Sequence, residues 1–406
     1  MKLKKETLGF LFVFLIIAGL FISFEIHPNF PDPDSFYHAK MATTIRDQGF
    51  INTFPWFQWT DLKNTYVNPH FLYHILLIPF VTFFNPLIGI KIAAGLFGLG
   101  AFAAIYLIAR FLKTPYPWLF PLIAAFSQNF LFRMALPRAP SLSIIFLLLA
   151  TWAMLENRKK TLFLTSIFFV WLYHGWPVIF LSLGALLVAN FITDSINNSD
   201  TWWQLFKKTF GQQKNNILAA TLGILTGLIV NPYFPQNIQF SLLDIFKIGI
   251  VNYQSILPVG QEWFPISNSA LLMACFPILL LNILCLAFFI PGLIASKNPP
   301  SKKQITAIFT FLLLAGGYFL LCFKANRYIE YAVPFATLEA AVLFPFAWFF
   351  WTKEIWPYIK EVLGKNWLRK TFTTVILLIV TAELATGSIK TVLVKDDYYQ
   401  AKQYET

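Results

Sequence analysis

Long apolar runs recur along the whole chain, and most are close to the length of a helix that crosses a membrane. Such a helix needs about 20 apolar residues. Hydrophobic residues make up 57% of the 406 residues and charged residues 12%, whereas a soluble chain has roughly 45–50% apolar and about 25% charged residues. These features predict an all-α polytopic membrane protein.

The basic residues set the predicted topology, because cytoplasmic loops carry an excess of Lys and Arg. The N-terminal run follows a basic start and has no small-residue cleavage site, so we interpret it as a retained span with a cytoplasmic N-terminus. The run at 69–84 is short and ends at Asn85–Pro86, and a crossing there would put Arg110 and the cluster 158–160 outside. We therefore predict a re-entrant helix at 69–84. Topology then explains the net charge of +12, and no nucleic-acid partner is expected.

Eleven spans follow from this topology, and an odd number places the C-terminus outside. The predicted spans are about 8–24, 86–112, 117–136, 141–156, 161–175, 177–193, 217–231, 268–294, 305–323, 331–351 and 371–394. They form one membrane domain over 1–394, with long outer segments at 27–68 and 231–267. Residues 395–406 would be an extracytoplasmic tail, interpreted as the start of a further domain. We expect an integral protein of a prokaryotic plasma membrane, in contact with membrane lipids.

The strip directly after the first span carries two carboxylates at the predicted outer membrane boundary. Pro31 and Pro33 favour an extended chain there. Asp34 is placed to N-cap a helix that continues to Asp47. The same carboxylate could instead present an acid to a polar head group. Asp32 is either a solvated loop acid or a further substrate contact.

Isolated arginines stand at the predicted outer ends of spans, where topology does not call for positive charge. They are Arg133, Arg138 and Arg327. Ionisable groups at membrane depth are functional candidates, and the planar guanidinium forms paired hydrogen bonds to phosphoryl oxygens. Arg327 could alternatively pair with Glu330 one turn later. Glu262 belongs to the later outer segment and could be a plain loop carboxylate.

Four histidines are further candidates for substrate or metal contacts. Asp34 and His38, like His70 and His74, are spaced four residues apart, which places each pair on one helix face. Together they could hold a transition metal, or the histidines could only form hydrogen bonds at the interface. His174 lies at an outer span end, where it could contact substrate or belong to a structural turn.

Three segments resemble parts of the oligosaccharyltransferase catalytic subunits, which are membrane glycosyltransferases of the GT-C type. They are Asp34-Ser35-Phe36-Tyr37-His38-Ala39-Lys40-Met41-Ala42, Gly260-Gln261-Glu262-Trp263-Phe264-Pro265 and Arg327-Tyr328-Ile329-Glu330-Tyr331-Ala332-Val333-Pro334. The resemblance implies a GT-C fold with a large first extracytoplasmic loop and a helix that dips back after it. It also implies that Asp34 is a catalytic, metal-binding carboxylate, that Glu262 contacts metal and acceptor, and that Arg327 meets the donor phosphate.

Two features of that family are missing from this chain. The stretch 133–142, equivalent to the family's second outer loop, has no acid pair, and no Trp-Trp-Asp-Tyr-Gly motif is present. We therefore do not expect protein N-glycosylation. A Mn²⁺ or Mg²⁺ ion on Asp34 and Glu262 is one expectation. Metal-independent catalysis, as in the related C-mannosyltransferases, is the other.

The expected function is transfer of a sugar or oligosaccharide from a polyprenyl-phosphate-linked donor to an unknown acceptor on the extracytoplasmic side. Such a reaction needs a carboxylate to activate the acceptor and positive charge for the departing phosphate. We assign the first role to Asp34, assisted by Glu262, and the second to Arg327, with Arg138 or Arg133 as further candidates. The rival functions are a transporter or flippase of lipid-linked glycans, which would place polar residues near mid-bilayer, and a non-catalytic relative that binds lipid-linked glycans.

Overall fold

The computed structural model describes residues 2–56, 58–60, 63–197, 200–251, 260–296 and 299–363, together with positions 371 and 374. Helix accounts for 80% of the described residues, which contain no strand, as predicted for an all-α protein. The α-helices are α1 (Lys2–Glu25), α2 (Asp34–Gln48), α3 (Phe71–Phe83), α4 (Pro86–Phe111), α5 (Leu119–Ala125), α6 (Gln128–Ala135), α7 (Pro140–Leu155), α8 (Lys159–Leu172), α9 (Val178–Asn197), α10 (Trp202–Ile229), α11 (Gln236–Leu243), α12 (Asn268–Ala295), α13 (Lys302–Cys322), α14 (Ile329–Phe350) and α15 (Trp356–Leu363). Short 3₁₀ or π-helical segments are η2 (Asp244–Val251), η3 (Gln261–Trp263), η4 (Asn326–Tyr328) and η5 (Trp351–Ile355).

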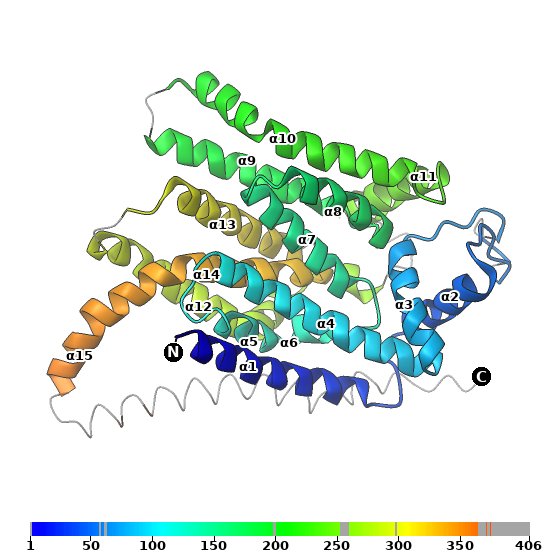
Figure 1. Ribbon diagram of the computed structural model, residues 1–406, viewed down its shortest axis with the longest axis horizontal. Coiled ribbons are helices and arrows are strands. Elements are labelled where there is room, and N and C mark those ends of the chain that lie inside the picture. Colours follow the sequence, from blue (N-terminus) through cyan, green and yellow to red (C-terminus); the bar gives the residue numbers. More distant parts are fainter. Residues whose placement is uncertain are drawn as a thin grey trace.

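The long helices form a bundle, and the shorter α2, α3 and α11 gather at one end of it (Figure 1). The N-terminus of α1 lies at the opposite end. Helix α14 packs against α12 and α13, α13 packs against α9, and α8 packs against α10. Buried side chains occupy almost the whole length of α14, so this helix forms the centre of the bundle. We call the end with α2, α3 and α11 the loop end.

Within the part of the chain that the structure describes, six helices are long and apolar enough to cross a membrane, so the chain has the character of an integral membrane protein. A seventh candidate joins α6 and α7, which are bent by 108° relative to each other. The predicted number of eleven is not confirmed. Helices α7 and α8 have 16 and 14 residues, or about 24 Å and about 21 Å of helix, whereas the hydrocarbon core is about 30 Å thick.

Two predicted spans are not seen as continuous helices among the described residues. The run 117–136 is split into α5 and α6, because the helix is interrupted at Phe126 and Ser127. The last predicted span, 371–394, lies outside the described residues except for positions 371 and 374, and the tail 395–406 lies entirely outside them.

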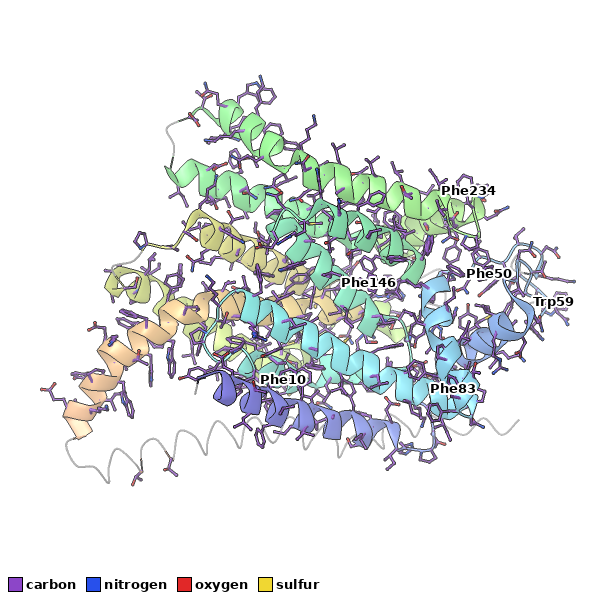
Figure 2. All side chains as sticks on the ribbon, viewed as in Figure 1. Phe10, Phe50, Trp59, Phe83, Phe146 and Phe234 are labelled. Atoms are coloured by element: carbon purple, nitrogen blue, oxygen red, sulfur yellow. The ribbon has the colours of Figure 1, made fainter. Side chains whose placement is uncertain are left out.

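Exposed aromatic side chains gather at the loop end of the bundle. Figure 2 labels Phe50, Trp59, Phe83 and Phe234 there. Trp59 is 96% exposed and Phe83 is 81% exposed. Aromatic rings are enriched where a membrane protein passes from hydrocarbon to water. Helix α3 has only 13 residues and packs against α2, α4 and α8; its predicted re-entrant path stays a prediction.

Gly292 offers a test of the packing between α12 and α14. A Cβ atom at this position would clash with the main-chain carbonyl of Phe346, and a carbonyl in a helix cannot rotate away. Gly292→Ala should therefore lower the free energy of unfolding by about 1–3 kcal/mol. The measurement is the thermal unfolding midpoint in detergent.

Gly316 on α13 is the matched control, because a Cβ there has no heavy atom within 4 Å. Gly316→Ala should be neutral or stabilising by about 0.5–1 kcal/mol, since alanine reduces backbone entropy in the unfolded chain. Equal midpoints for both variants would contradict close packing at Gly292.

Candidate active site

The first turn of α2 separates the roles of two neighbouring acids. The Asp32 carboxylate accepts a hydrogen bond from the Ser35 main-chain N–H at 3.1 Å. Pro33 occupies the N-cap position, and no side chain caps the helix from that position. The prediction that Asp34 is the N-cap is therefore wrong, because Asp32 already binds the exposed N–H of the first turn. The Asp34 carboxylate instead accepts from Arg138 at 3.0 Å and remains 51% exposed.

Three arginines from different segments converge on Glu262 of η3. Its Oε2 atom lies 3.0 Å from Arg133 and 3.3 Å from Arg138, and its Oε1 atom lies 3.5 Å from Arg327. Arg133 also pairs with the buried Glu330 at the start of α14. The alternative pairing of Glu330 with Arg327 is thus replaced by a pair with Arg133. These contacts join α6, the α6–α7 connection, η3, η4 and α14.

The guanidinium groups control the protonation of Glu262. Burial alone would raise the pKa of this carboxyl group, but Arg327, Arg133 and Arg138 lower the pKa to about 2. Glu262 is therefore ionised at neutral pH. A carboxylate this acidic is a weak proton acceptor, because an effective base has a pKa near the working pH. Its position suits a counter-ion more than a base.

The cluster opens into a cavity of about 170 Å³. Its lining residues are His38, His70, Arg138, Ala139, Pro140, Tyr173, His174, Asp244, Glu262, Trp263 and Arg327. A second cavity of about 260 Å³ shares five of these residues, including Asp244 and Arg327, and has mostly apolar walls otherwise. A polar chamber thus adjoins an apolar one.

Arg327 is positioned by aromatic rings between the two cavities. Its guanidinium carbon lies 4.2 Å from the centre of the Trp263 ring, and it donates to the Tyr173 hydroxyl. Arginine packs on aromatic faces because the guanidinium is planar and weakly hydrated. Neither aromatic residue was among the sequence candidates. Trp263 follows Glu262 directly, and Tyr173 directly precedes His174. The sequence could therefore have indicated both residues as neighbours of candidate site residues.

The histidines occupy two places in this site. His38 and His70 line the polar cavity, and His74 is buried behind His38. His174 lies 3.6 Å from Asp244 of η2, a residue that the sequence analysis missed. The sequence feature that could have indicated Asp244 is that it is a single acid within an apolar stretch of the segment 231–267. Burial, with nearby arginines, lowers the pKa of His174 to about 3, and burial raises that of Asp244 to about 6.

The residues present do not fit a bound divalent cation. Among the described residues, no group of three or more His, Cys, Asp and Glu side chains is arranged to hold a metal ion. Asp34 and Glu262, the expected ligands, both accept from Arg138. A cation between them would meet the guanidinium charge at close range, so the donor set opposes Mn²⁺ or Mg²⁺.

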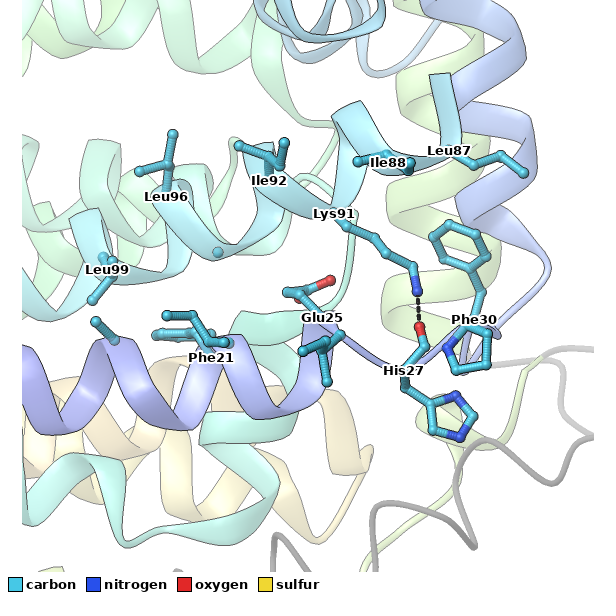
Figure 3. Close-up of a pocket in the computed structure, with 15 residues that line it drawn as sticks. Phe21, Glu25, His27, Phe30, Leu87, Ile88, Lys91, Ile92, Leu96 and Leu99 are labelled. Carbon is cyan, nitrogen blue, oxygen red and sulfur yellow. Dashed lines mark hydrogen bonds between the residues drawn. The ribbon is translucent and has the colours of Figure 1, made fainter. Parts of the chain in front are cut away.

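A larger groove of about 550 Å³ lies between α1 and α4, away from the arginine cluster (Figure 3). Its walls are mostly aliphatic. Lys91 donates to the main-chain carbonyl groups of His27 and Asn29 and lies over the Phe30 ring. These contacts tie the segment after α1 to α4. None of the candidate site residues lines this groove.

Comparisons with known proteins give no match, either to a protein-family model or to a curated protein. Any functional conclusion for this chain therefore rests on the geometry of its site.

The pKa of Glu262 yields a pH-dependent prediction. A carboxyl group whose folded-state pKa is lowered stabilises the fold above its ordinary pKa of 4.5 and loses this contribution as the pH falls toward about 2. Glu262→Gln should therefore unfold at lower temperature than the wild type at pH 7. The difference should shrink between pH 4.5 and pH 2. The measurement is the thermal midpoint in detergent across this range.

Glu354→Gln serves as the control, because Glu354 is an exposed carboxylate of η5. It should unfold at the wild-type temperature at pH 7. A Glu262→Gln variant that is as stable as the wild type at pH 7 would show that the three ion pairs do not stabilise the fold.

Proposed function

We propose that this protein is a membrane glycosyltransferase that takes a sugar from a polyprenyl-phosphate-linked donor. The observation that carries the proposal is the pair of adjoining cavities, one polar with two guanidinium groups in its wall and one largely apolar. A lipid-linked sugar phosphate has the matching parts, a phosphate between a polar sugar and a hydrocarbon chain. Arg138 and Arg327 are the groups that would bind the phosphate.

Glu262 is the resting counter-ion of these arginines in this proposal. It accepts from Arg133, Arg138 and Arg327. A donor phosphate would bind Arg138 and Arg327, while Glu262 stays paired with Arg133. Because the guanidinium groups are already oriented by Glu262 and by the aromatic rings, little reorganisation is needed when negative charge develops on the leaving phosphate. The role of Glu262 as an assisting base, expected from the sequence, is replaced by this positioning role.

Asp34 lies at the mouth of the site, half exposed and bound to Arg138. This position suits contact with the acceptor or with the donor's sugar. The chemistry is proposed to be independent of metal, because the donor set opposes a divalent cation. The proposed site faces the extracytoplasmic side, in line with the charge pattern of the loops.

The location of the cluster favours an enzyme over a transporter. Its polar groups come from α2, the α6–α7 connection, η3 and η4, which meet where the outer segments join the bundle. A transporter would be expected to have its substrate site near the bilayer midplane, on interrupted helices. Binding without turnover is the remaining alternative, and an assay of product release distinguishes it from catalysis.

The test is release of polyprenyl phosphate from a panel of polyprenyl-phosphate sugars by purified protein in detergent, with and without EDTA. Arg138→Gln should lower kcat/KM by about 100-fold, because one donor to the departing phosphate is lost. EDTA should leave the wild-type rate unchanged.

Arg110→Gln is the control. Arg110 is an exposed arginine in the last turn of α4, at the end of this helix that lies away from α3 and the loop end (Figure 1). It should keep the wild-type rate. Donor binding without release of polyprenyl phosphate, across the whole panel, would overturn catalysis and leave a binding protein.

A further inference from the structure

A chain of hydrogen bonds links Asn68 to the polar cavity through two buried histidines. The Asn68 Oδ1 atom accepts from the main-chain N–H of His70 at 3.0 Å. Because a main-chain N–H can only donate, this contact fixes which end of the Asn68 amide is the oxygen. The same oxygen lies 3.0 Å from Nδ1 of His74, so that nitrogen must carry the proton.

The proton positions then follow along the chain. His38 and His74 are neutral, since burial and the neighbouring histidines lower the pKa of both rings. A neutral His74 with its proton on Nδ1 has an acceptor at Nε2. This Nε2 atom lies 2.8 Å from Nδ1 of His38, so His38 donates through Nδ1. The lone pair of His38 is therefore on Nε2.

His38 lines the polar cavity beside Arg138 and Glu262. Its Nδ1 atom donates a hydrogen bond to His74, and the described residues show no hydrogen bond to its Nε2 atom. The groups around the ring are Tyr37 on α2, His70, Tyr73 and His74 from α3 and the residue before it, and Arg138 from the α6–α7 connection.

We infer that His38 is the general base of the transfer reaction, with Asn68 and His74 as positioning residues that hold its tautomer. The inference rests on the proposed function. Neither acid is as well suited, because Asp34 is bound to Arg138 and Glu262 is bound to three guanidinium groups. A histidine whose ring is oriented by a chain of partners is a common design for proton abstraction.

The step involves a hydroxyl group of the acceptor. Its oxygen forms a bond to the anomeric carbon of the donor sugar as the bond between that carbon and the phosphate oxygen breaks. The phosphate leaves with the bonding electron pair and is held by Arg138 and Arg327. The hydroxyl proton passes to Nε2 of His38. No oxidant or metal is required.

The experiment measures polyprenyl-phosphate release by wild type, His38→Gln, Asn68→Ala and Asn68→Asp over pH 4–9. His38→Gln keeps a similar shape and should lower kcat by about 100-fold or more with little change in donor KM. Asn68→Ala should lower kcat, and Asn68→Asp should restore it because a carboxylate still accepts from His74. Because burial lowers the pKa of His38, the wild-type rate should stay level near neutral pH and fall only well below pH 6.5, and His38→Gln should lack this acidic limb.

His27→Gln is the matched control, because His27 is a half-buried histidine of the segment after α1 that does not line the polar cavity, and it should behave as wild type. ¹⁵N NMR of histidine-labelled resting protein gives an independent readout, with both His38 and His74 expected to carry the proton on Nδ1. An active His38→Gln enzyme would overturn the base assignment and leave the proposed function standing. A wild type that is inactive on every donor would overturn the proposed function and the base role with it. A proton on Nε2 of His38 would overturn the hydrogen-bond direction in either case.

Discussion

The site depends on one ionic interaction, the binding of Glu262 by three guanidinium groups. Two of these arginines come from α6 and the adjacent α6–α7 connection, and the third comes from η4, far away in the sequence. Charges at the end of a membrane bundle are costly to bury unless they are paired. Each arginine is therefore compatible with the fold only while the others and Glu262 are in place, and the paired charges hold several segments in one arrangement.

This interaction also explains why the residues divide into two chemical groups. Glu262, among the arginines, is held as an anion, because the guanidinium groups lower its pKa. The histidines lie behind them in a less polar environment and remain neutral. An anion paired with a cation is a poor proton acceptor, whereas a neutral imidazole whose lone pair has no hydrogen-bond donor can accept a proton. The cavity thus places guanidinium groups and imidazole rings within one small volume.

The rest of the bundle supports this end. Close packing between α12 and α14, which leaves no room for a Cβ at Gly292, fixes the direction in which α14 approaches the site. Glu330 and Arg327 lie at the start of that helix or just before it. Small residues at helix crossings allow such close approach, because van der Waals contact is the main attraction between helices in lipid. Rigid helix packing therefore positions the charged end.

The sequence by itself determined the class of protein and the chemical inventory. Apolar runs predicted an all-α membrane protein, because the hydrophobic requirement of a spanning helix is local and additive along the chain. The misplaced charges Arg133, Arg138 and Arg327 were visible as candidates for the same local reason. Only the tertiary structure decided their partners. Glu330 pairs with Arg133 instead of Arg327, Asp32 replaces Asp34 at the helix start, and Asp244 reaches His174, because pairing depends on distances between segments that no local pattern encodes. The number of helices long enough to span was likewise decided by where chain breaks fall, as between α5 and α6.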